Sequence, residues 1–146
     1  MNEIIKSIKD FMMNTNLDEQ FYEAVVKRLE TFGYEVKVDD AWTISFCIQK
    51  VENRIKSSCN ILSIPDGLFN VAVDMTCGEF LFALKQTGKL ELGDLDLSGA
   101  ITELREGDTT IRFSEGSSED EKFTMFLNYL LTRGESDFIC YRRLRW

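Results

Sequence analysis

The last six residues of the chain carry the residue types best suited to binding another molecule. They are Tyr141, Arg142, Arg143, Leu144, Arg145 and Trp146. Three arginines and two aromatic residues thus end a protein whose formal net charge is −8. Arginine, tyrosine and tryptophan are enriched at interface hot spots because each joins a large apolar area to a polar or charged tip. A frayed helix end would gain nothing from an exposed tryptophan, so we expect this segment to dock on a partner.

The partner of this segment is expected to be a protein. Arginines beside a tryptophan also suit nucleic acid, because cations bind phosphates and indole rings stack on bases. Three cations on an otherwise acidic chain give only a weak electrostatic attraction for a phosphate backbone, however, and this favours a protein partner.

The residues that commonly perform catalysis or bind metals are scarce. The chain has no histidine, which removes Ser-His and Cys-His nucleophile pairs and the commonest metal ligand. The four cysteines are Cys47, Cys59, Cys77 and Cys140. They are irregularly spaced and form no CxxC pair, so we expect buried, reduced thiols rather than a zinc site. Asp74 and Glu79 lie within the most apolar segment, where an acid is more often paired than catalytic. We therefore expect no catalytic, cofactor-binding or metal-binding residues.

Length and composition indicate one soluble domain that spans residues 1–146. The chain is 44% hydrophobic and 29% charged, which is ordinary for a globular protein. No apolar run approaches the ~20 residues that a membrane-spanning helix needs, and the first residues do not form a signal peptide. We expect an intracellular protein that does not enter a membrane.

Apolar residues at helical spacing predict the elements that position these groups. A first helix carries Ile4, Ile5, Ile8, Phe11 and Met12. A second is expected to begin at a capping Asn16, to carry the stripe Phe21, Val25, Leu29 and Phe32, and to end at Gly33. A third helix is expected to begin at Asp39 or Asp40 and to end near Asn60. Its buried face carries Ile44, Ile48, Val51 and Ile55, and its polar face carries Gln49, Lys50, Glu52, Asn53 and Lys56.

The fourth predicted helix is the centre of the core. Ser63 is expected to cap it, with Pro65 in its first turn. Nearly every position from Leu68 to Leu84 is apolar, and Gly88 suits its end. Gly78 in its middle costs roughly 1 kcal/mol against alanine, so we expect a neighbouring helix to approach closely there.

Residues 89–118 interrupt the helical pattern with glycines and acids. Within them Thr109, Thr110, Ile111, Arg112 and Phe113 predict a short strand. Its pairing partner is either Ile101–Leu104 or another subunit. A capping box at Ser118–Glu121 then predicts a helix that Gly134 closes, and a last short helix begins at Ser136 or Asp137. The expected fold is mainly α, a helical bundle or long α-hairpin core with one short β-containing insertion before the C-terminal helices.

Five segments in this order resemble one protein family. They are the helix end Arg54–Asn60, the start Ile64–Leu68, the apolar stretch Ala72–Leu84, the insertion Glu106–Phe113 and the C-terminal Tyr141–Trp146. The chain from about Asp40 to Trp146 resembles the head–tail connector, or adaptor, proteins of long-tailed phages and of prophages in Gram-positive bacteria. Residues 1–38 lie outside this resemblance.

The resemblance implies a structural protein of the virion neck. About twelve copies of such a subunit form a ring beneath the portal. The ring continues the DNA channel, without specific DNA binding, toward a downstream neck or tail protein. Tyr141–Trp146 become the candidate portal contact, and Thr109–Phe113 the candidate contact with a neighbouring subunit or neck protein. The protein would be found in the host cytoplasm before assembly and in the virion afterwards.

The net charge of −8 fits this interpretation, since acidic channel walls repel the phosphates of passing DNA. The same net charge is also explained if it only keeps the protein soluble. A second hypothesis is a small acidic phage regulator that binds a host protein, possibly as a DNA mimic. A third is an enzyme that relies on carboxylates or lysine.

Overall fold

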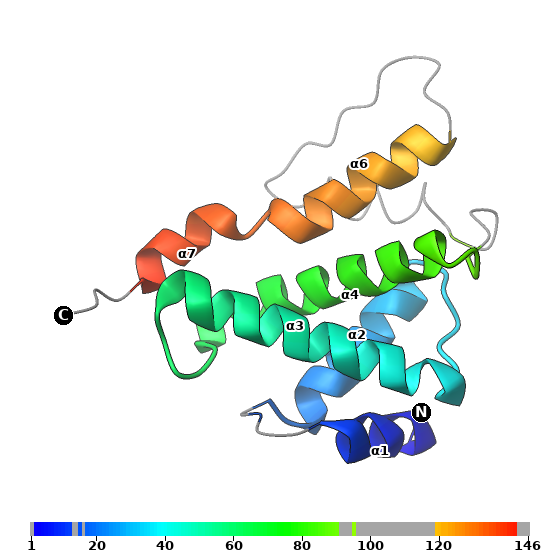
Figure 1. Cartoon of the computed structure of the whole chain (residues 1–146), viewed down its shortest axis with the longest axis horizontal. Helices are drawn as coiled ribbons and strands as arrows, with labels where there is room; N and C mark the ends of the chain where they lie inside the picture. Colours follow the sequence, from blue (N-terminus) through cyan, green and yellow to red (C-terminus); the bar gives the residue numbers. More distant parts are fainter. Residues whose placement is uncertain (1, 13–14, 16, 91–94, 96–118, 143–146) are drawn as a thin grey trace.

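The chain folds into packed α-helices, which confirms the expected mainly α class (Figure 1). The computed structural model describes residues 2–12, 15, 17–90, 95 and 119–142. The elements are α1 (Asn2–Phe11), α2 (Glu19–Thr31), a 3-10 turn (Val38–Asp40), α3 (Ala41–Cys59), a second 3-10 turn (Asp66–Leu68), α4 (Phe69–Gln86), α6 (Glu119–Thr132) and α7 (Glu135–Tyr141). No strand occurs among the described residues. The strand predicted at Thr109–Phe113 and its partner Ile101–Leu104 lie outside them.

Helix α4 is the central element, as the sequence predicted. It packs against α2, α3 and α6, while α1 packs on α2 and α3, and α7 contacts α3. Figure 1 shows α3 and α4 running in opposite directions as an α-hairpin, with α6 on the other side of α4 from α3. Asn60 turns the chain out of α3 in a left-handed conformation (φ 54°), which asparagine tolerates better than most residues.

The central position of α4 follows from its composition. Its buried residues are Val71, Ala72, Val73, Asp74, Met75, Thr76, Cys77, Gly78, Phe80, Leu81 and Leu84. Each large apolar side chain buried here contributes about 1.5–3 kcal/mol to folding. Two aromatic contacts join α4 to its surroundings: Phe80 meets Tyr34 edge-on at 5.5 Å between ring centroids, and Phe69 meets Phe21 of α2 edge-on at 5.5 Å.

The expectation that no segment is long and apolar enough to cross a membrane was wrong. The segment Asp66–Gln86 passes that test by length and composition. Within the fold, however, 67% of its most apolar window is buried against other helices, as in the core helix of a soluble protein.

Three of the predicted helix starts were misplaced. Helix α7 begins at Glu135, ahead of the predicted Ser136 or Asp137. The N-cap of α2 is Asp18, whose side chain accepts a hydrogen bond from the backbone N–H of Phe21, and Asn16 lies outside the described residues. Ser63 does not cap α4, because Pro65 is extended (φ −66°, ψ 152°) and the first turn begins only at Asp66. The predicted helix ends after α2 and α4 are confirmed, since Gly33 and Gly88 both have positive φ.

The glycines at 78 and 134 allow helices to approach closely. A Cβ at position 78 would lie 3.1 Å from the Cβ of Leu130, so the predicted approach of another helix to Gly78 is confirmed. Helix α6 ends at Thr132, just before Gly134, as predicted. The φ of −93° at Gly134 is available to any residue, however, and a Cβ there would overlap Cγ1 of Val71. The lack of a side chain at Gly134 therefore allows the turn before α7 to pack closely against α4.

Glu52 was placed on the polar face of the third helix, which was wrong. Its side chain is only 5% exposed, yet it accepts a hydrogen bond from the Thr15 hydroxyl at 2.5 Å and pairs with Lys56 at 2.6 Å. Burial of a carboxylate is tolerated when such partners replace water. The polar stripe of α3 is therefore narrower than the sequence indicated.

Three cysteines are buried free thiols, as predicted, namely Cys47, Cys59 and Cys77. The side chain of Cys140 lies outside the described residues. Burial is the main cause that raises the pKa of Cys47 from 9.0 to about 12, with a further contribution from nearby Glu79. Burial likewise raises the pKa of Cys77 well above 9.0.

These pKa shifts predict loss of stability in alkali. A thiol whose pKa is higher in the folded protein holds its proton longer than in the unfolded chain. Its contribution to stability is therefore complete below about pH 9 and is lost as the pH rises through the folded pKa. We expect the melting temperature to fall between about pH 9 and pH 12. The double variant Cys47→Ala/Cys77→Ala should show a shallower fall, and an equally steep fall would contradict this assignment.

Candidate functional site

The C-terminal segment is positioned by α7, which packs against the end of α3. Arg54 of α3 donates a hydrogen bond to Glu135 of α7 at 2.7 Å. Phe138 is buried in the core, and the Cys59 thiol lies 3.7 Å from its carbonyl oxygen. These contacts fix α7, after which the described part of the chain ends at Arg142.

Of the six predicted docking residues, the structure describes Tyr141 and Arg142. Tyr141 is half-buried and packs against the core, with its hydroxyl so close to Gly67 that a Cβ there would overlap it. Arg142 is exposed and extended (φ −65°, ψ 137°), so the helix ends and the chain leaves it there. Residues 143–146 lie outside the described part, as do Thr109–Phe113. Tyr141 therefore contributes to holding the segment on the fold.

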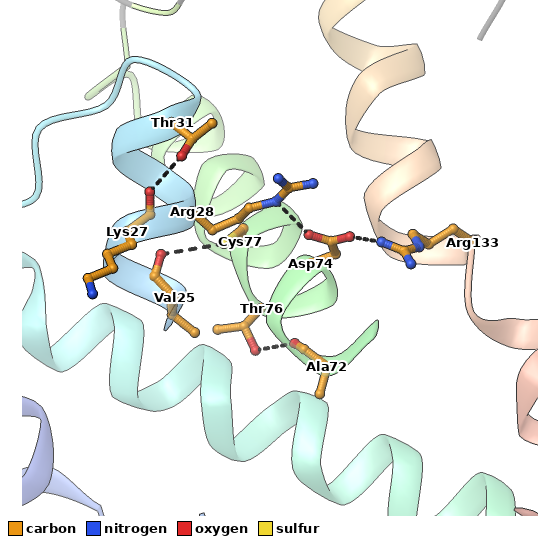
Figure 2. A network of polar contacts seen from close by, with 9 residues as sticks. All are labelled: Val25, Lys27, Arg28, Thr31, Ala72, Asp74, Thr76, Cys77 and Arg133. Carbon is orange, nitrogen blue, oxygen red and sulfur yellow. Dashed lines mark hydrogen bonds and ion pairs between the residues drawn. The ribbon is translucent and has the colours of Figure 1, made fainter. Parts of the chain in front are cut away.

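Asp74 forms the main buried ion cluster (Figure 2). Arg28 of α2 donates from Nε to its Oδ1 at 3.0 Å, and Arg133, which follows α6, donates to its Oδ2. The Asp74 side chain is 3% exposed. The Arg28 guanidinium also lies over the Phe32 ring, 4.9 Å from its centroid. Each carboxylate oxygen of Asp74 thus binds a different arginine, and this pairing joins α2, α4 and the turn before α7.

The two acids of the apolar segment are therefore both paired. Glu79, the second, binds Lys50 of α3 at 3.1 Å. The geometry agrees with the prediction that these carboxylates are paired. Among the described residues, no group of three or more Cys, Asp or Glu is arranged to hold a metal ion.

Sequence reasoning missed an exposed aromatic pair on α3. Trp42 and Phe46 are 59% and 56% exposed, and their rings stack at 5.7 Å between centroids with an interplanar angle of 15°. Their spacing of four residues places them on one side of the helix, off the stripe that begins at Ile44. The sequence could have revealed this pair, because two large aromatic residues outside the buried stripe of a helix must face either water or a partner.

A groove of about 530 Å³ lies between α4 and α6. Apolar side chains form much of its lining: Phe82, Phe123, Met125, Leu127 and Leu131. Phe82 and Met125 are 45% and 39% exposed. The ion pair Lys85–Asp120, at 3.2 Å, spans the two helices that form the groove.

No protein-family model matches this chain, and neither curated proteins nor solved structures show a significant match to it.

Proposed function

We propose that this protein is a structural, non-enzymatic subunit of a phage or prophage head–tail connector. About twelve copies form a ring that docks on the portal and continues the DNA channel toward the tail. The ordered motifs from Arg54 to Trp146 support this proposal, and the mainly α fold is compatible with it. In this role the subunit meets its partners in the host cytoplasm and remains in the neck of the virion.

The observation that carries the proposal is the presentation of the basic C-terminal segment. Helix α7 is held by the Arg54–Glu135 pair and by buried Phe138, and the chain leaves it at exposed Arg142. A segment that begins at a fixed point loses less conformational freedom on binding than a free one. The arginine and tryptophan side chains that follow in the sequence are the groups that we expect the partner to bind.

The charge distribution supports the same role. Without the three C-terminal arginines, the net charge of −8 becomes −11 for the rest of the chain. A chain with this net negative charge attracts the phosphates of passing DNA only weakly, because phosphate affinity comes from clustered lysine and arginine.

The proposal predicts that the last three residues are required for portal binding. Purified portal complexes of the phage or prophage that encodes this chain should co-sediment it. Deletion of Leu144, Arg145 and Trp146 should weaken binding at least about tenfold, because tryptophan and arginine dominate interface energies. A matched control, Lys27→Gln/Lys89→Gln, removes two exposed cations elsewhere and should bind normally.

Two results would count against this account. If the deletion variant binds the portal as tightly as the intact chain, the segment does not dock on the portal. Failure of the intact chain to bind the portal, together with capture of a host regulatory protein, would favour the acidic regulator instead.

A further inference from the structure

We propose that the pocket beside Asp74 binds a small phosphate compound. This pocket lies between α2, α4 and the turn before α7, and its volume is about 440 Å³. Arg28, Asn70 and Arg133 are among the residues that line it. The site is separate from the basic C-terminal segment, and the inference does not depend on the proposed connector role.

The arginines of the pocket use only part of their guanidinium groups on Asp74. Arg28 and Arg133 donate to different oxygens of the Asp74 carboxylate, and Figure 2 shows one guanidinium group on each side of it. An arginine carries several N–H donors in a planar fork, so a single bond to Asp74 leaves others for a ligand. Both side chains are partly exposed. Guanidinium groups suit phosphate because two parallel N–H donors match two of its oxygens.

The charges that line the pocket leave a positive surplus for an anion to balance. Lys27, Arg28 and Arg133 are each positively charged. Asp74 is the one acid among the described lining residues, so the surplus is two positive charges. A phosphate monoester carries close to two negative charges near neutral pH. The rest of the acidic chain opposes binding only weakly, because salt screens exposed charges beyond about 10 Å at 0.1 M.

Lys27 and Asn70 supply further donors at the edge of the pocket. Lys27 is exposed and extends away from Asp74 in Figure 2, and its flexible stem lets the ammonium group turn toward a bound anion. Asn70 is exposed in the first turn of α4, and its amide nitrogen is a donor. A bound phosphate would therefore contact α2, α4 and the turn before α7 together.

The size of the pocket and the charge of the chain favour a small ligand over DNA. Pockets of about 300–1,000 Å³ commonly hold small molecules, so this one has room for an organic group beside the phosphate. A DNA duplex would instead bring its neighbouring phosphates against a chain of net charge −8. We therefore assign the pocket to a small phosphate compound, either the free ion or a phosphomonoester.

Backbone amide NMR spectra of the purified full chain test this inference. The chain is titrated with phenyl phosphate or with inorganic phosphate, and sodium chloride keeps the ionic strength constant. Saturable shifts should appear at the amides of Asn70 and Arg133, with a Kd of about 1 mM or lower for at least one probe. Tighter binding of phenyl phosphate assigns the pocket to a phosphomonoester, whereas equal or tighter binding of inorganic phosphate assigns it to the free ion.

Two matched variants locate the bound anion. Asn70→Asp keeps the shape of the side chain but adds a negative charge to the pocket, so binding should weaken at least about tenfold. Asn53→Asp makes the same change on the exposed surface of α3, and Asn53 does not line this pocket, so binding should stay normal. Both positions are exposed, and both variants should fold.

The inference is overturned if neither probe causes a saturable shift at these amides. It is also overturned if Asn70→Asp binds as tightly as the intact chain, or if Asn53→Asp weakens binding as much as Asn70→Asp does. A DNA duplex that shifts the same amides at lower concentration than either probe would show that the pocket serves DNA and not a small molecule.

Discussion

Replacement of Asp74 by alanine should lower the free energy of unfolding by about 3 kcal/mol, because it removes the buried carboxylate to which Arg28 and Arg133 both bind. Fully buried pairs lose about 3–5 kcal/mol when one partner is removed. The lower end applies here, since the side chains of Arg28 and Arg133 are 23% and 30% exposed and keep some contact with water. For a chain of this length the melting temperature should fall by roughly 10 °C.

The matched control for Asp74 is an exposed ion pair. Lys9 and Glu19 pair at 3.0 Å with side chains 64% and 57% exposed. Glu19→Ala should change stability by less than about 1 kcal/mol, because exposed pairs contribute little. Chemical denaturation of both variants measures the difference. Equal, small effects would show that the Asp74 cluster does not join α2, α4 and the turn before α7.

Replacement of Gly134 by alanine should destabilise the protein by about 2–3 kcal/mol through overpacking. The backbone at Gly134 suits alanine, so the effect comes from contact between the added methyl group and Val71 of α4. Val71 is buried, and its branched side chain has few rotamers into which it can withdraw. The turn between α6 and α7 would have to move away from α4, and α7 with it.

A double-mutant cycle identifies this mechanism. Val71→Ala removes the methyl groups that the new Cβ would meet, so Gly134→Ala/Val71→Ala should be at least as stable as Gly134→Ala alone. Simple addition of two losses would show that the glycine is needed for another reason.

Helix positions were largely predictable because they depend on local patterns. The stripes at Phe21, Val25 and Leu29 and at Ile44 and Ile48 are buried as their spacing indicates. The close approach of a helix to Gly78 was also predictable, since a glycine inside an apolar helix has few explanations other than close packing. The spacing of apolar residues along the chain was thus enough to predict which residues form the core.

The errors arose where distant residues decide the outcome. Glu52 is buried because Thr15, far away in sequence, supplies a hydrogen bond. The close approach of Val71 to Gly134 likewise depends on how α4 and α6 pack. No local pattern contains these contacts.

The candidate site, too, was predictable from local composition but not where it depends on the packing of distant residues. The composition of the last six residues predicted an interface, but only the structure shows that Tyr141, the first of them, packs against Gly67. Trp42 and Phe46 were overlooked because the helical stripe of isoleucines explained the same segment. Their exposure became evident only when α3 was placed between its neighbours.

Electron microscopy of portal complexes mixed with this chain tests the proposed connector role most directly. A collar of added density should appear on the tail-facing side of the portal, coaxial with its channel, and should be absent with the chain that lacks residues 144–146. Portals that remain bare at saturating concentrations of the intact chain, or density that lies off the axis, would contradict the account.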